Sequence, residues 1–300
     1  MNRRKFLKAT LISGIAISSP EILFPLIAPA DAAVKSDLAV ARGTSPARIT
    51  RAAIDGLGGI KRFISRGDVV VVKPNIGWDR TPEYAANTNP EVVATIVRLC
   101  YEAGAKKVKV FDNTVSNAKR CYKQSGIADA VSAVGGLVSF IDDRKFRDMK
   151  LSGYALRSWP LYMEVFEADK IINVPIAKTH GLTTLTLGMK NWMGIMGGWR
   201  GRIHQRIDGS LVDVSMAVTP VLVVLDAVRI LTANGPQGGD LSDVKLLNTV
   251  VAGTDQVAVD AYGATLFGMR GSDLAYVRMG HEAGLGTMEL SKLKIKRITA

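Results

Sequence analysis

The segment Val69-Val70-Val71-Val72-Lys73-Pro74-Asn75 joins an uninterrupted β-branched run to a short polar end. Four consecutive valines are typical of a strand that is buried on both faces of a parallel sheet. Asn89-Pro90-Glu91 then supplies an N-cap, a proline at the first helical position and an acid in the first turn. We therefore predict a strand followed by a helix that ends at Gly104, a residue suited to the position after a helix.

The same alternation of strand and helix continues along the chain. Further strands are predicted at 107–111, 137–141, 170–174, 221–225 and 248–252, and further helices at 127–134, 184–193 and 257–267. Such alternation predicts an α/β fold with a mostly parallel sheet and helices on both faces. We treat residues 33–300 as one domain. If the domain has two lobes, their boundary falls near residues 144–168, where the pattern is least regular.

The N-terminus has the parts of a signal peptide. Arg3 and Arg4 precede Lys5-Phe6-Leu7-Lys8, an apolar run follows, and Ala30-Asp31-Ala32 offers a small-residue cleavage site. An arginine pair in this context indicates the twin-arginine route, which exports folded proteins. We therefore expect residues 1–32 to engage the twin-arginine export machinery, and the remainder to work in the periplasm. The apolar run is short for a membrane span, although an uncleaved anchor is the alternative.

Composition limits the classes of ligand and partner that the protein is expected to bind. The formal net charge is +12, and residues 33–300 retain +10 because the first 32 carry four basic and two acidic side chains. This balance favours anionic ligands or an anionic membrane surface, and nucleic-acid motifs are absent from the sequence. No segment after the leader is expected to span a membrane stably. The two cysteines, Cys100 and Cys121, are too few for an iron–sulfur or zinc cluster.

Polar residues gather where predicted strands end. Lys73 and Asn75 follow the valine run, and Lys178 and His180 come soon after a later strand. In open α/β sheets, ligands bind outside the carboxyl ends of the strands. We therefore expect these four residues, together with Lys190, to line one crevice.

Residues 170–207 contain eight basic side chains and not one Asp or Glu. A solvated face normally mixes both signs, so this acid-free segment predicts a surface that faces an anion. Lys73, Asn75, Lys190, Asn191, Arg202 and His204 are the expected anion-binding residues. We expect Lys190 and Arg202 to contribute more than Arg206, which lies next to Asp208. A flexible basic loop without a ligand is the alternative.

Several motifs resemble one known family in both residues and order. They are Val72-Lys73-Pro74-Asn75, Asn89-Pro90-Glu91, Ala103-Gly104-Ala105, Ile172-Asn173-Val174-Pro175, Lys178-Thr179-His180, Met189-Lys190-Asn191-Trp192-Met193-Gly194 and Asp255 to Asp260. The chain thereby resembles the family catalogued as domain of unknown function 362, over nearly all of residues 33–300. Some members of that family carry a ferredoxin-type iron–sulfur module, for which this chain lacks the cysteines.

A second resemblance is to the nickel-pincer lactate racemase family. Leu187-Gly188-Met189-Lys190 and Ile203-His204 are similar in layout to a glycine-rich lysine stretch and a later histidine of that family. The resemblance implies that Lys190 tethers a cofactor and that His204 is a ligand or an acid/base. Met189 departs from the family's paired glycines before the lysine. The residues themselves identify neither a metal nor an organic cofactor.

Together these patterns predict an exported enzyme that acts on a small anionic substrate, a carboxylate or a phosphate, in a basic crevice. Lys178 and His180 would then be the acid/base residues. The alternative is a non-catalytic periplasmic protein for anion binding or assembly that uses the same crevice. Docking to anionic lipid is a third hypothesis, and it would require an exposed basic face.

Overall fold

The structure, a computed structural model, describes residues 36–300. These residues belong to one compact unit, Lys35–Ala300. The expected signal peptide, residues 1–32, lies outside the described residues. Between residues 36 and 300, no helix is both long enough and apolar enough to cross a bilayer.

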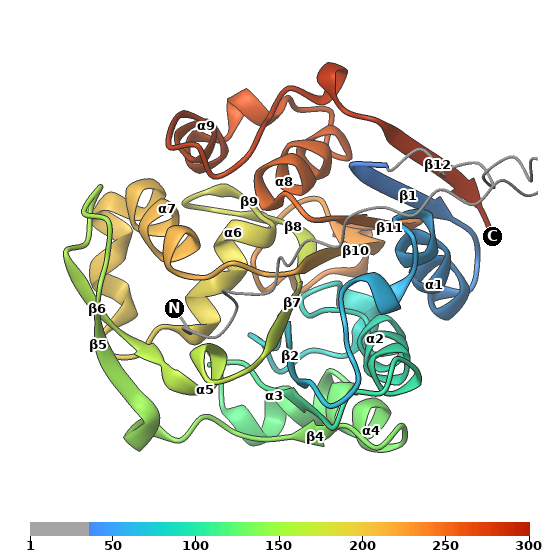
Figure 1. Cartoon of the computed structure of the whole chain (residues 1–300). Coiled ribbons are helices and arrows are strands. Elements are labelled where there is room, and N and C mark those ends of the chain that lie inside the picture. The colour runs from blue at the N-terminus through green and yellow to red at the C-terminus, as the bar shows by residue number, and fades with distance from the viewer. Residues whose placement is uncertain (1–35) are drawn as a thin grey trace, which may run out of the picture. The chain divides into compact units, whose positions relative to one another are not determined.

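A ten-stranded mixed sheet forms the centre of the unit (Figure 1). Its main path runs β12-β1-β11-β10-β7-β2-β3-β4, while β8 pairs with β10 and β9 pairs with β8. The strands are β1 (Leu38–Arg42), β2 (Val69–Pro74), β3 (Lys107–Val110), β4 (Leu137–Val138), β7 (Lys170–Val174), β8 (Ile176–His180), β9 (Thr184–Thr186), β10 (Leu222–Leu231), β11 (Val244–Gly253) and β12 (Ile295–Thr299). Strand β11 is antiparallel to β1 and β10, and β9 is antiparallel to β8. The remaining neighbours in this ten-stranded sheet are parallel.

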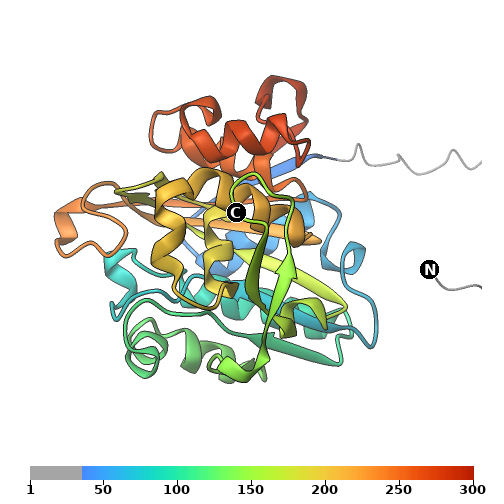
Figure 2. The ribbon, with the colours of Figure 1, turned by 90° about the vertical axis from the view of Figure 1, so that its left-hand side faces the viewer.

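Helices cover both faces of this sheet, and Figure 2 views the molecule from the side on which α6 and α7 lie. One face is covered by α1 (Pro46–Gly56), α2 (Pro90–Glu102), α3 (Ala118–Gln124) and α4 (Ile127–Ser132). The other is covered by α6 (Gly188–Asn191), α7 (Ile207–Ala217), α8 (Gln256–Thr265) and α9 (Ala275–Glu282). The predicted fold, a mostly parallel sheet with helices on both faces, is confirmed.

Between residues 144 and 168 the chain forms a separate two-stranded hairpin, β5 (Phe146–Lys150) and β6 (Ser158–Tyr162), followed by the short helix α5 (Met163–Phe166). Leu161 and Tyr162 of the hairpin pack with Trp192 in the same apolar cluster. The hairpin therefore belongs to the layer that carries α6 and α7.

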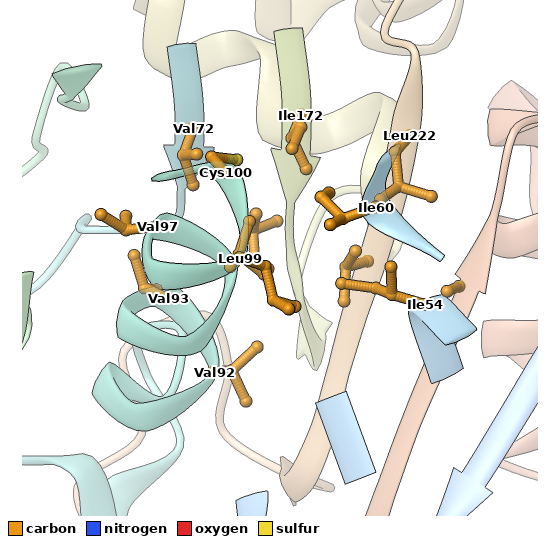
Figure 3. Packing of buried hydrophobic residues seen from close by; sticks show 14 of the residues in the cluster. Ile54, Ile60, Val72, Val92, Val93, Val97, Leu99, Cys100, Ile172 and Leu222 are labelled. Carbon is orange, nitrogen blue, oxygen red and sulfur yellow. The ribbon is translucent and has the colours of Figure 1, made fainter. Parts of the chain in front are cut away.

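The valine run explains why β2 lies at the centre of the sheet. Val70 and Val72 face the α2 side, where Val72 lies near Val97 and Cys100 (Figure 3). Val71 faces the opposite side and packs in the cluster of Trp192. Because consecutive strand residues point to opposite faces, an all-valine strand is buried on both.

Helix α2 begins as its sequence indicates. The Asn89 side chain accepts a hydrogen bond from Glu91 N (2.9 Å), and Pro90 occupies the first turn. The helix ends before Gly104, whose φ of +95° suits glycine.

The helix predicted at 184–193 is wrong over its first half. This stretch forms β9, the short helix α6 and a 3-10 turn (Trp192–Ile195). Thr184, with φ 62°, and Leu187, which is extended, are both outside the helical region. Tertiary pairing of β9 with β8 thus overrides the local helical pattern.

Candidate functional site

A cavity of about 390 Å³ opens where β2, β3 and β8 end. Its lining comes from these strand ends, from β9 and α6, and from the segment 198–204. Of the expected site residues, the cavity is lined by Asn75, Lys178, His180, Lys190, Asn191 and His204. The structure thus brings together residues that are more than a hundred positions apart in sequence.

The path of the chain from β7 into β8 places Lys178 and His180 at this edge. Only Pro175 separates β7 from β8, and the pairing partner changes there. Strand β7 lies between β2 and β10, whereas β8 pairs with β10 and with β9. Strand β8 therefore extends beyond the carboxyl end of β7 and carries both side chains over the end of the parallel sheet.

Lys73 lies beneath the cavity. Its Nζ lies 2.7 Å from Asp112 Oδ1, and it donates hydrogen bonds to Pro74 O (2.8 Å) and Asn191 Oδ1 (3.1 Å). The Lys73 side chain is fully buried. Its charge is balanced by Asp112, so Lys73 supports the site from below, and the expectation that it contacts a bound anion stays a prediction.

Asn191 connects this buried pair to the cavity. Its Oδ1 accepts from Lys73 Nζ and from Asn75 Nδ2 (3.2 Å), and its Nδ2 donates to Lys73 O (3.1 Å) and Asn173 Oδ1 (2.8 Å). The four hydrogen bonds satisfy the amide completely. Asn191 is therefore a positioning residue whose orientation is fixed by its neighbours.

Lys178 is buried with two neutral acceptors. Its Nζ donates to Asn75 Oδ1 (3.2 Å) and to Ala86 O (2.5 Å). Within residues 36–300 it forms no ion pair with a carboxylate. Burial, together with the charge of Lys190, lowers the pKa of Lys178 to about 7.

Lys190 is the second buried lysine of the cavity. It is 8% exposed, and its Nζ contacts Met193 Sδ (2.7 Å), a weak acceptor. Burial, followed by the charges of Arg200 and Lys73, lowers the pKa of Lys190 to about 7. No carboxylate in the described part of the chain pairs with it. A buried ammonium that lacks a strong hydrogen-bond acceptor is unfavourable, and a bound anion would stabilise it.

Arg200 supplies the third cation of the cavity. Its guanidinium donates to Asn113 O (2.8 Å), Thr114 O and Met193 O (3.3 Å), which fixes its position at the lining. Its hydrogen-bond acceptors are neutral carbonyls, and burial lowers the pKa of Arg200, while the charge of nearby Asp112 acts in the opposite direction. Lys178, Lys190 and Arg200 thus create a positive interior above the neutral Lys73–Asp112 pair.

Arg202 does not line the cavity, and its expected role in anion binding stays a prediction. Arg202 is exposed and lines a separate hollow beside residues 155–160, whereas Arg200 lines the cavity. Both lie in one 3-10 helix, Arg200–Arg206, in which side chains two residues apart point roughly 120° away from each other. Arg206 donates to Tyr154 O (2.7 Å) and is likewise outside the cavity.

His180 is a hydrogen-bond donor at neutral pH. Burial, together with the nearby charges of Lys190 and Lys178, lowers the pKa of His180 to about 3. Its Nδ1 accepts from Leu182 N (3.1 Å), so the proton of the neutral ring is on Nε2. Burial also lowers the pKa of His204, and its neighbour Lys190 adds to the effect.

Buried side chains fix α6 and with it Lys190. Asp260 accepts from Gly188 N (2.6 Å) and Met189 N (2.8 Å), and Asn173 Nδ2 donates to Gly188 O (2.9 Å). A carboxylate satisfies two amides at the start of the helix, where it is also favoured by the helix dipole. Asp260, the last residue of the Asp255–Asp260 motif, therefore has a structural role, because it holds α6 in place.

The cavity lining includes residues that the sequence does not single out as site residues, and four of them carry side chains of note. They are Asp112, Thr186, Trp199 and Arg200. Asp112 follows a predicted strand, which is a usable signal, and Arg200 lies in the acid-free segment. Thr186 has a buried hydroxyl without a hydrogen-bond partner, and Trp199 is 75% exposed at the rim. Neither the unpartnered hydroxyl of Thr186 nor the exposure of Trp199 can be predicted from the sequence alone.

Lys190 and His204, which the racemase resemblance implies as tether and ligand, both line the cavity. Residues 36–300 contain no group of three His, Cys, Asp or Glu side chains arranged for a metal ion. The Nδ1 atom of His180 is not available as a metal ligand, because it accepts a hydrogen bond from Leu182 N.

Comparisons with known proteins give the relationships of the chain. The family described as Domain of unknown function (DUF362) matches residues 70–265. Thylakoid-associated protein sll1697 of Synechocystis sp. is 31% identical over 225 residues, which cover 70% of this chain and 66% of that protein. The chain thus spans just under two thirds of that relative. The lactate racemase apoprotein of Thermoanaerobacterium thermosaccharolyticum is similar with a TM-score of 0.46 and 11% identity, over 76% of this chain and 56% of that one. Since the family match covers more than half of its length, the chain belongs to the DUF362 family.

Proposed function

We propose that the cavity binds a carboxylate or phosphate group of a small molecule, and that the protein acts on this molecule as an enzyme. The observation that carries the proposal is a set of three basic side chains at one cavity, the buried Lys178 and Lys190 and the half-buried Arg200, none of which forms an ion pair with a carboxylate in residues 36–300. Burial of unpaired charge is unfavourable unless a counter-ion is supplied. An anionic ligand would supply it.

Each residue has a role in this proposal. Lys190 and Arg200 hold the anionic group, since Lys190 has only a thioether for a partner and Arg200 is fixed by carbonyls. Lys178 exchanges a proton near neutral pH, in line with its pKa of about 7. His180 donates a hydrogen bond through Nε2, and Asn75 and Asn191 position the lysines.

We further propose that the protein works in the periplasm after twin-arginine export. The support is the Arg3-Arg4 pair before an apolar run. A non-catalytic periplasmic protein for anion binding or assembly would use the same cavity, and it would bind ligand without turnover. The enclosed position of the cations supports a small-molecule site over docking to lipid headgroups.

Calorimetric titration with inorganic phosphate and with oxalate tests the anion site. We compare wild type with Lys190→Ala and, as a matched control, Arg202→Ala, which removes a basic side chain outside the cavity. A charge-assisted hydrogen bond contributes about 1.5–3 kcal/mol, so Lys190→Ala should weaken binding roughly ten- to a hundredfold. Arg202→Ala should leave the affinity unchanged. Equal weakening by both, or no binding by wild type, contradicts the proposal.

A further inference from the structure

Lys178 differs from the other buried lysines of the site in what surrounds its Nζ. Lys73 is paired with Asp112, and Lys190 contacts only a thioether sulfur. Lys178 is held by two neutral oxygens, those of the Asn75 side chain and the Ala86 backbone. These bonds orient the nitrogen, yet neither partner carries a negative charge that would retain the ammonium proton.

Positive neighbours act in the same direction. Lys190 lines the same cavity as Lys178, and Lys73 lies beneath it; besides burial, the charges of both lower the pKa of Lys178, while Asp112 acts in the opposite direction. A lysine that is desolvated or lies beside another cation loses its proton more easily, and the free amine is a nucleophile. The near-neutral pKa of Lys178 agrees with this environment.

The anion site lies beside this amine. Lys190 and Arg200 would fix a carboxylate, and Lys178 lines the same cavity, with its Nζ hydrogen-bonded to Asn75 Oδ1, another lining residue. His180 is two residues from Lys178 on β8, and alternation along a strand puts both side chains on one side. Its Nε2 proton can therefore donate to an oxygen of the same ligand.

We propose that Lys178 forms an imine with the carbonyl carbon of a small oxo acid whose carboxylate is held by Lys190 and Arg200. This inference rests on the proposed anion site and assigns its substrate class. In the step, Lys178 Nζ loses a proton and adds to the carbonyl carbon, which forms a C–N bond and a carbinolamine. The proton then returns to the hydroxyl, water leaves, and a protonated imine remains. Ammonium and oxo acid thus give iminium and water without an oxidant or a reductant.

Reductive trapping tests the imine. The protein is incubated with pyruvate or glyoxylate and sodium cyanoborohydride, and the products are identified by intact mass and peptide mapping. We expect one reduced adduct per chain, on Lys178, and loss of this adduct in Lys178→Arg. Lys123→Arg, which changes an exposed lysine, should retain it. Acetone, which has a carbonyl but no carboxylate, should give little adduct.

Further outcomes separate this inference from the anion site. If phosphate binds but no adduct forms, the proposed imine is contradicted, while the proposed anion site is still supported. An adduct on Lys190, or on exposed lysines at a similar rate, overturns the assignment to Lys178. Failure of phosphate and oxalate to bind removes the proposed function itself. The melting temperature and phosphate affinity of Lys178→Arg show whether the lost adduct reflects lost chemistry or lost folding.

Discussion

Lys73 Nζ lies 2.7 Å from Asp112 Oδ1, in a pair whose two side chains are both buried below the cavity. The pair joins the ends of β2 and β3, and Asp112 Oδ2 also accepts from Ile76 N (2.6 Å). The pair connects two neighbouring strand ends, and Asp112 neutralises Lys73. The other three cations at this edge are Lys178, Lys190 and Arg200. The positive interior of the cavity depends on the other three.

Breaking this pair should destabilise the protein strongly. Asp112→Asn leaves Lys73 as an uncompensated buried charge, a change that costs about 3–5 kcal/mol in comparable pairs. The control is Asp129→Asn, which breaks an exposed pair with Lys123 and should cost about 0–1 kcal/mol. Urea unfolding measures both. Similar small losses in the two variants would show that the buried pair does not support the fold.

Gly194 should not tolerate a side chain. A Cβ at this position would overlap with Asp112 Oδ1 and Lys73 Nζ, whereas a Cβ at Gly181 would meet nothing within 4 Å. Gly194→Ala should therefore cost about 1–3 kcal/mol or more through overpacking. Gly181→Ala is the matched control and should be tolerated. Thermal unfolding of both variants checks this, and a stable Gly194→Ala would mean that the pair can move aside.

Anion affinity should depend on pH through the two lysines. Lys178 and Lys190 have pKa values of about 7 in the free protein, and a bound anion raises them because it favours the charged forms. Binding therefore takes up protons, and affinity is highest below about pH 7 and falls as the pH rises above it. Sulfate is the suitable probe because it does not titrate in this range. Constant sulfate affinity from about pH 6 to about pH 9 would contradict the prediction.

The sequence identified those parts of the fold that depend on local signals. The valine run, the Asn89 cap and Gly104 define β2 and α2 almost without error. The strand at 170–174 matches β7 at both ends. These elements are specified by burial on both faces and by caps that act within a few residues.

Features that depend on long-range pairing were missed. Strand β9 was predicted as helix because its identity depends on pairing with β8. The pairing of Lys73 with Asp112 was not predicted, because Asp112 is 39 positions away in sequence. The position of Arg200 rather than Arg202 at the cavity was not predicted, because the phase of a 3-10 helix cannot be read from residue types.

Export should depend on Arg3 and Arg4, which lie outside the described residues. Replacing both with Lys keeps the charge but removes the arginine pair that the twin-arginine route recognises. We expect precursor to accumulate in the cytoplasm, measured by fractionation and immunoblotting. Lys5→Arg is the control and should be exported normally. Equal periplasmic yield of the double variant would show that another route is used.

Lys178 should lower stability at neutral pH, because its burial disfavours the charged form that the unfolded chain holds. Its pKa of about 7, against about 10.5 in an unfolded chain, means that the folded protein binds fewer protons than the unfolded chain between these values. Stability therefore rises with pH across this window, and the penalty is greatest below about pH 7. At pH 7 the penalty is on the order of 4 kcal/mol.

Replacing Lys178 with Met removes this penalty but leaves Asn75 Oδ1 and Ala86 O without a donor. Unpaired buried acceptors cost about 1–3 kcal/mol, so relief of the buried charge wins at neutral pH. Lys178→Met should then raise the melting temperature at pH 7 and lose that advantage near pH 10, while it abolishes imine trapping. Lys73→Met is the control and should destabilise at both pH values, because it leaves Asp112 unpaired. If Lys178→Met destabilises the protein at pH 7 as much as Lys73→Met does, the prediction is contradicted. Lys178 would then be a structural residue whose charged form stabilises the folded protein.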